Sequence, residues 1–163
     1  MSERTRMIVL AILASIPVLF LATFIPYIRI WVPNRHAGDF SAKLMEMVDG
    51  QREFHMEEIT DFDWDRMVVF GPYTSRGEME ERAGVKWTVH SYFGYYIIQK
   101  TALADLDLMD DAANKLIFMK GNKVVLDVTF FRKKVDLTHL KTTIPREEAR
   151  FRAEGRALKQ MTD

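Results

Sequence analysis

Three aspartates alternate with aromatic residues in the run DFDWD at residues 61–65. Clustered carboxylates are ligands that Ca²⁺ prefers, and together with His90 they would offer the groups for metal-dependent hydrolysis. The run lacks the glycine and the bidentate glutamate that an EF-hand loop requires at fixed positions. We therefore interpret Asp61, Asp63 and Asp65 as a solvated segment that leads into a strand, and we keep the enzyme as a minor alternative.

Other residue types that commonly perform catalysis are scattered along the chain. The four histidines include no HExxH pair, and there is no cysteine to complete a zinc site. Neither Ser75 nor Ser91 lies in a nucleophile elbow, and no glycine-rich loop joins a strand to a helix to hold phosphate. The sequence predicts no catalytic residue, no metal site and no cofactor, and we expect a protein that is not an enzyme.

Aromatic side chains are more numerous than a small core requires, and such residues dominate both protein cores and interface centres. Phe70 and Trp87 are expected in the core. The three cations at residues 132–134 close a predicted strand and are interpreted mainly as a solvated strand end. These patterns favour a protein partner and no nucleic acid. The candidate partner-binding residues are Trp64, Tyr73, Tyr95, Tyr96, Arg132, Lys133 and Lys134.

The element that must place these groups is an apolar segment near the N-terminus. Residues 7–25 (MIVLAILASIPVLFLATFI) carry no charge, and as a helix they reach roughly 30 Å, the thickness of the hydrocarbon core of a bilayer. Apolar residues occur on every face, so the segment is predicted to cross the membrane rather than lie on it. Pro17 is expected to kink this helix, with the Ser15 hydroxyl bonding a freed carbonyl. The aromatic and basic residues at 26–31 mark its end.

Cleavage and orientation of this anchor stay open. A cleaved signal peptide is the competing interpretation, but the apolar core is long and residues 21–24 (LATF) make a poor cleavage site. Two arginines precede the segment and two follow it, which gives little guide to orientation. A short N-terminal tail with two arginines normally stays in the cytoplasm. We therefore expect a single-pass protein of the cell inner membrane with its C-terminal part in the periplasm.

The chain is predicted to divide into three parts. Residues 1–33 form the anchor with its interfacial end, residues 34–144 an extracytoplasmic α+β domain, and residues 145–163 a charged C-terminal helix. The length after the anchor suffices for one hydrophobic core. The predicted fold class is α+β, with one N-terminal transmembrane helix followed by a small antiparallel-sheet domain with two or three packed helices.

Helical signals are clear in two places. Apolar residues at i, i+4, i+7 and i+8 predict a helix at residues 39–50, capped by Asp39 or Ser41 and ended by Gly50. Thr74 or Ser75 is expected to cap a second helix, which runs through residue 82 and stops at Gly84.

Strand signals are clear in three places. Strand composition followed by Gly-Pro predicts a strand at residues 66–70. Gly121-Asn122 predicts a tight hairpin between strands at residues 115–120 and 123–131. One parity of the second strand is wholly apolar and is expected to face the core: Val124, Leu126, Val128 and Phe130.

Four further segments have weaker signals. Residues 51–59 fit a strand or a loop, and residues 87–99 predict one or two strands with a bend at Gly94. Residues 103–109 alternate apolar and acidic residues, as in an edge strand. Residues 145–161 begin with a proline and two glutamates near the first turn, which predicts the marginal C-terminal helix.

The runs FDWDRMVVFGPY (residues 62–73) and LIFMKGNKVV (residues 116–125) resemble a pattern in small membrane-anchored or lipoprotein-like bacterial proteins of unassigned function. In those proteins the first run lies between two short helices and the second is a hairpin. The resemblance implies a compact extracytoplasmic α+β domain on a tether, and it carries no catalytic residues. The chain departs from the lipoprotein-like members because it has no cysteine for acylation.

The leading hypothesis is a membrane-tethered extracytoplasmic domain that acts by protein–protein contact. Both an inhibitor or immunity protein and an accessory subunit of an envelope complex fit this description. The alternative is a structural subunit of a larger membrane assembly, with Ala11, Ala14 and Ser15 as a small-residue face for helix packing. An envelope hydrolase or metal-dependent enzyme is the less favoured hypothesis.

Overall fold

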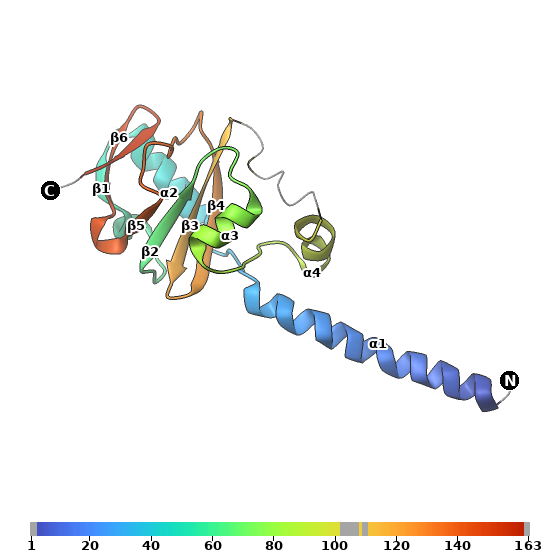
Figure 1. The fold of residues 1–163 in the computed structure, drawn as a ribbon. Helices are drawn as coiled ribbons and strands as arrows, with labels where there is room; N and C mark the ends of the chain where they lie inside the picture. The colour runs from blue at the N-terminus through green and yellow to red at the C-terminus, as the bar shows by residue number, and fades with distance from the viewer. Residues whose placement is uncertain (1–2, 102–107, 109–110, 162–163) are drawn as a thin grey trace.

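A computed structural model describes residues 3–101, 108 and 111–161 and shows one long helix joined to a head of two antiparallel sheets and several short helices (Figure 1). The long helix α1 (Glu3–Ile30) points away from the head, and α2 (Ala37–Asp49) begins after a short connection. The α+β class predicted from the sequence is confirmed, including the single candidate span at the N-terminus.

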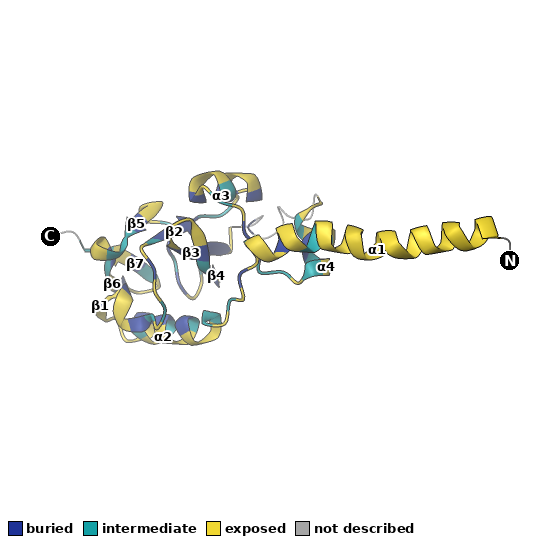
Figure 2. Ribbon diagram, turned by 90° about the horizontal axis from the view of Figure 1, so that it is seen from below, coloured by how far each residue is buried: buried dark blue, intermediate teal, exposed yellow. Residues whose placement is uncertain are grey.

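Helix α1 is long and apolar enough to cross a membrane. It has 28 residues, a mean hydropathy of 2.8 in its most apolar window, and no part of that window is buried in the head. Figure 2 shows it exposed along nearly its whole length. Pro17 lies inside the helix, and the Ser15 hydroxyl donates to the carbonyl of Ile12 at 2.8 Å. That bond misses the carbonyl of Leu13, the one that Pro17 leaves without its helical donor.

The two predicted helices of the head are confirmed with small changes at their ends. Helix α2 starts at Ala37 without a side-chain cap, and Gly50 keeps right-handed geometry while Gln51 takes the positive φ of 51°. Helix α3 (Arg76–Ala83) begins as predicted, because the Ser75 hydroxyl accepts from the backbone N–H of Glu78.

The central sheet has the strand order β4-β3-β2-β5, with every neighbouring pair antiparallel. Its strands are β2 (Arg66–Phe70), β3 (Ala113–Lys120), β4 (Lys123–Phe131) and β5 (Thr143–Pro145). The predicted strand and hairpin are therefore confirmed. Lys120 pairs with Lys123 across the two-residue turn, in which Gly121 has a φ of 53° that glycine adopts without strain.

A β-bulge moves one predicted core residue to the opposite face of the central sheet. The register of β3 against β4 shifts between Phe118 and Met119, so Val125 becomes an extra residue in β4. As a result Val124 packs with Ile117 instead of facing α2. The rest of that predicted parity does face the α2 side: Leu126, Val128 and Phe130. Strict alternation cannot predict an inserted residue.

Both faces of the central sheet are buried. On one face, α2 and a second sheet of order β1-β6-β7 enclose the larger core, in which the ring of Phe118 makes edge-to-face contacts with Phe40, Phe62 and Trp64. On the other face, α3 and Trp87 cover a smaller core that includes Phe70. The strands of the second sheet are β1 (Glu53–His55), β6 (Arg150–Glu154) and β7 (Ala157–Gln160).

The charged helix predicted for residues 145–163 is wrong. The described part of this segment forms the end of β5, a 3₁₀ turn (η4, Arg146–Glu148) and the β6-β7 hairpin. Gly155 takes a φ of 62° at the turn of that hairpin. Phe151 and Ala153 are buried at a spacing of two, which is the period of a strand. The proline and glutamates near residue 145 are typical of a helix start, but here they belong to the end of β5 and the η4 turn. Residues 51–59 hold β1 and the 3₁₀ turn η1 (Met56–Ile59).

The strands predicted within residues 87–99 are also wrong. The segment ends in a short helix, made of α4 (Tyr92–Gly94) and a π-helical turn η2 (Tyr95–Gln99), which lies against the end of α1 (Figures 1 and 2). Aromatic composition favours strands when side chains pack across a sheet, but here the rings pack against another helix. The strand predicted at residues 103–109 lies outside the described residues, apart from Leu108.

Phe118→Ala should destabilise the protein by about 3–5 kcal/mol, because it empties the centre of the larger core. The matched control is Phe131→Ala, a change on an exposed ring that should stay within about 0.5 kcal/mol. Denaturant unfolding of the full chain in detergent micelles measures both. Equal effects of the two substitutions would contradict this description of the core.

Stability should fall in acid partly through Asp136, which holds the chain between β4 and β5. Burial opposes its charge, but hydrogen bonds from Thr138 and the ion pair with Arg132 outweigh this and lower the pKa of Asp136. A lowered folded pKa stabilises the fold above the unfolded pKa of about 4, and this contribution is lost as the pH falls through the folded pKa.

Asp136→Asn should therefore reduce stability at neutral pH. It should also make the free energy of unfolding fall less steeply as the pH is lowered, which gives a flatter acid limb in a plot of that free energy against pH. Asp49→Asn, at the exposed end of α2, controls for the change in net charge. An unchanged acid limb in Asp136→Asn would refute the assigned role.

Candidate functional site at the junction of helix and head

The three aspartates of the run at residues 61–65 are held by basic side chains. Asp61 lies 3.0 Å from His36, and Lys120 lies 3.0 Å from Asp63 and 2.8 Å from Asp65. The hydrogen bond from Lys120, with a second from the backbone N–H of Gly121, lowers the pKa of Asp65. This arrangement fastens the β3-β4 turn to the start of β2.

His90 has different neighbours from these carboxylates. Its backbone carbonyl accepts a hydrogen bond from the Tyr27 hydroxyl of α1 at 3.1 Å. Within the described residues, no group of three or more histidines, aspartates and glutamates is placed to hold a metal ion. The convergence that the hydrolase hypothesis required, His90 beside the aspartates, is not among the contacts that the structure gives these groups.

Three of the candidate partner-binding residues make structural contacts within the protein. Trp64 is fully buried, with its indole N–H donating to the Thr60 hydroxyl at 3.0 Å, so its prediction as a contact residue is wrong. Tyr95 is buried against Tyr27 of α1. Arg132 pairs with Asp136 and donates to the carbonyl of Asp111. No signal in the sequence indicated that Trp64 and Tyr95 are buried.

The remaining exposed candidates lie at one end of the central sheet. Phe70 pairs with Lys115 and Ala113 with Phe131, so β2 ends, β3 begins and β4 ends at the same side. Tyr73 is 62% exposed there and Phe131 57%, and the Lys133 ammonium lies 5.6 Å from the centre of the Phe131 ring. We call this surface the strand-end patch: Tyr73, Phe131, Lys133 and Lys134. Phe131 was not predicted as a contact residue, although its outward parity was visible.

A second site forms around Trp87, where the head meets the end of α1. The Trp87 indole N–H donates to the carboxylate of Asp127 at 2.7 Å, and Lys115 pairs with the same carboxylate at 3.1 Å. Both charged side chains are almost fully buried. The Trp87 carbonyl accepts from Arg76 and, at 2.7 Å, from Gln99, and the Arg76 guanidinium lies 4.0 Å from the centre of the Trp87 ring.

The chain that leaves α1 is bonded to the head on both sides. The backbone N–H of Thr88 donates to the carbonyl of Ile30 at 2.9 Å, and the N–H of Val32 donates to the carbonyl of Thr88 at 2.8 Å. Two residues after Val32, the Asn34 side chain bonds both the N–H and the carbonyl of Asp127 at 2.9 and 2.7 Å. An amide side chain thereby takes the place of a neighbouring strand on the edge of β4.

The short helix at residues 92–99 is bonded directly to α1. The Tyr92 hydroxyl lies 2.6 Å from the Thr23 hydroxyl, and the Tyr96 hydroxyl donates to the Thr23 carbonyl at 2.9 Å. The Tyr92 ring also contacts Phe24 at 5.5 Å and Tyr27 at 5.4 Å between ring centres. Two separate sets of contacts, one on the backbone and one aromatic, therefore fix the head to the last turns of α1.

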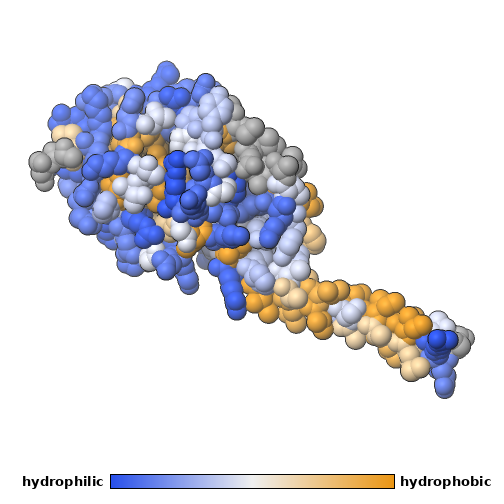
Figure 3. All heavy atoms as spheres, in the orientation of Figure 1, coloured by the Kyte–Doolittle hydropathy of each residue, from blue (hydrophilic) through white to orange (hydrophobic). Residues whose placement is uncertain are grey.

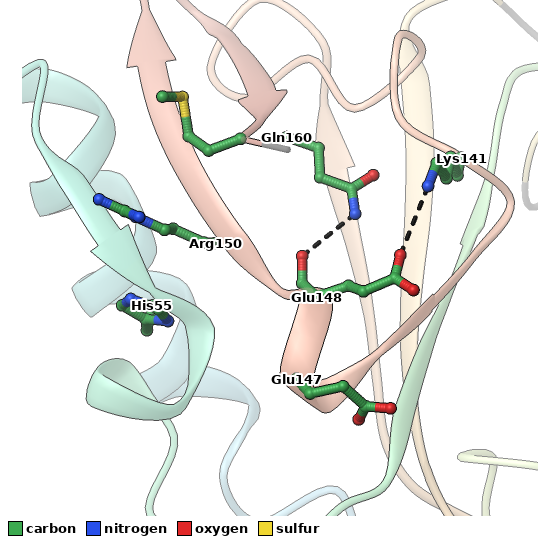
Figure 4. A pocket seen from close by; sticks show the side chains of 7 residues that line it. His55, Lys141, Glu147, Glu148, Arg150 and Gln160 are labelled. Atoms are coloured by element: carbon green, nitrogen blue, oxygen red, sulfur yellow. Dashed lines mark hydrogen bonds and ion pairs between the residues drawn. The ribbon is translucent and has the colours of Figure 1, made fainter. Parts of the chain in front are cut away.

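A hollow of about 390 Å³ lies on the far side of the head, between β1 and the η4 turn (Figure 4). His55 and Arg150 line one side, with Lys141, Glu148 and Gln160 opposite. Lys141 lies 3.4 Å from Glu148, and Gln160 donates to the Glu148 carbonyl at 3.1 Å. Because Lys141 and Gln160 already bond Glu148, we assign no ligand to the hollow.

Comparisons of the chain with protein-family models, curated proteins and solved structures gave no match.

Asp127→Ala should cost about 3–5 kcal/mol of stability, because it removes the buried carboxylate that pairs with Lys115 and accepts from the Trp87 indole. Thr129→Ala, two residues along the same strand and exposed, is the matched control. Replacing both charges, in Lys115→Met with Asp127→Leu, should recover part of the loss. Denaturant unfolding measures all three, and a loss below about 1 kcal/mol for Asp127→Ala would be incompatible with a buried ion pair.

Proposed function

We propose that this chain is a single-pass membrane protein whose head binds a second protein at the outer face of the cytoplasmic membrane, as an accessory subunit of an envelope complex. The observation that carries the proposal is the direct attachment of the head to the end of an apolar helix that the head does not cover. A helix surface of this kind is stable in lipid, and the head then sits at the membrane surface.

The fixed junction favours an accessory subunit over a tethered inhibitor. An inhibitor that captures a diffusing effector gains reach from a long flexible linker. Here the connection between Ile30 and Ala37 is short, and Thr88 and Asn34 bond it to the head. A head held at a set height and orientation suits a partner that is itself fixed in or on the same membrane.

The strand-end patch supplies the surface for such a partner. Tyr73 and Phe131 are large exposed aromatics, the type of side chain that anchors protein interfaces. Lys133 and Lys134 beside them would favour an acidic partner surface and speed its approach. An enzymatic role has less support, because the aspartates near residue 63 are paired with Lys120 and Arg146.

A photo-crosslinking amino acid placed at Tyr73 or at Phe131 in the full chain should give a protein adduct in native membranes. The same amino acid at Lys43 on α2 or Lys159 on β7, both exposed, is the matched control and should give none. Adducts are detected by immunoblot and identified by mass spectrometry. Adducts from the controls alone, or from no position, would refute the patch.

Two changes to the same strains separate the competing hypotheses. A phosphatase fused after Asp163 should be active, because it would lie in the periplasm; an inactive fusion would place the head in the cytoplasm. Exchange of residues 7–19 for an unrelated apolar sequence should leave the adducts unchanged, because this stretch is exposed along its length. Loss of the adducts would favour lateral assembly through the span.

A further inference from the structure

The short helix beside α1 is uncharged. Residues 90–99 (HSYFGYYIIQ) include no aspartate, glutamate, lysine or arginine. Residues 92–99 of this stretch form α4 and the π-helical turn η2, at whose end the N–H of Lys100 bonds the carbonyl of Tyr95 at 3.0 Å. Helical backbone bonds are the kind that lipid requires, because acyl chains offer no hydrogen-bond partner.

The height of this helix along α1 follows from its contacts. Tyr92 and Tyr96 both bond Thr23, and the Tyr92 ring lies 5.6 Å from that of Phe20. Thr23 is seven residues before the end of α1, which is about 10 Å along the axis. It also lies within the apolar segment at residues 7–25. Tyr92 and Tyr96 are therefore level with lipid-facing turns of α1, whereas Gln99 at the other end of the short helix bonds the Trp87 carbonyl of the head.

The side of this helix that faces away from α1 is apolar and exposed. Phe93 is 72% exposed and Ile97 is 62% exposed, and their spacing of four places them on one face. Figure 3 shows hydrophobic atoms at the position of α4, beside the hydrophobic surface of α1, whereas most of the visible head surface is hydrophilic. Both apolar surfaces therefore lie at the junction of helix and head.

Polar residues mark where this apolar surface stops. Lys100 follows the helix directly, with its ammonium 5.5 Å from the centre of the Tyr95 ring. On α1, Arg29 lies in the last turn and the exposed Trp31 follows it. Tryptophan, tyrosine and cations of this kind are typical of a membrane–water boundary.

We propose that residues 92–99 are a second membrane-inserted element, with Phe93 and Ile97 among the acyl chains of the leaflet that the C-terminal turns of α1 cross. This inference rests on the proposed role of α1 as a membrane span. The head is then attached to the bilayer at two points, which prevents it from rotating about the axis of α1. The strand-end patch is presented in one direction as a result.

The chain has no cysteine, so single-cysteine variants carry one label each. Phe93→Cys and Ile97→Cys are labelled with a nitroxide in the otherwise unchanged full chain, reconstituted in vesicles of phosphatidylethanolamine and phosphatidylglycerol. Leu13→Cys in the middle of α1 reports on the span, and Phe131→Cys reports on the head; both native side chains are exposed. Relaxation by oxygen, which concentrates in lipid, is compared with relaxation by a nickel chelate, which stays in water.

We expect relaxation by oxygen to exceed relaxation by the nickel chelate at residues 13, 93 and 97, and the reverse at residue 131. The ratio of oxygen relaxation to nickel relaxation should differ several-fold between residue 131 and the other three positions. Oxygen dominance at residue 13 with nickel dominance at residues 93 and 97 would overturn the inference and leave the anchor intact. Shielding of residues 93 and 97 from both probes would overturn it in favour of contact with a second copy. Nickel dominance at residue 13 would remove the anchor and the proposed function with it.

Discussion

The carboxylate of Asp127 is the group on which the arrangement of helix and head depends. It lies inside the protein, where a negative charge is costly unless it is both paired and hydrogen-bonded. Lys115 from the neighbouring strand supplies the charge, and the indole N–H of Trp87 supplies a further bond. Asn34 bonds the backbone of the same residue. The sheet, the segment after α3 and the chain leaving α1 therefore meet at one residue.

The residues that follow Trp87 in the chain connect this site to α1. Once Trp87 is fixed, the next residue, Thr88, bonds the backbone on both sides of Trp31. A few residues later Tyr92 and Tyr96 reach Thr23. The junction consequently combines polar bonds near the head with aromatic contacts further along α1. Its composition changes from polar to apolar in the direction that a chain entering a membrane requires.

The central sheet lets a small head without disulfides bury enough apolar surface. Its two middle strands are covered on both faces, and most residues of β3 are buried. The bulge at Val125 helps this arrangement, because it sends Val124 to the Trp87 side while Leu126 stays on the α2 side. The charged pair at the junction is held within the smaller core, so the fold and the attachment of α1 are stabilised together.

Local sequence determined the elements whose signals lie within a few residues. The sequence correctly predicted the apolar run of α1, the helix start at Ser75 and the turn at Gly121. Each depends on neighbouring residues alone: an unbroken apolar stretch, a side chain that caps a helix, or a glycine at positive φ. Tertiary structure decided the rest. Residues 92–99 are helical because their rings pack on α1. Residues 150–160 form a hairpin because Phe151 and Leu158 fill the larger core. Trp64 is buried because Phe118 lies against it. These outcomes depend on partners distant in sequence, which no local pattern identifies.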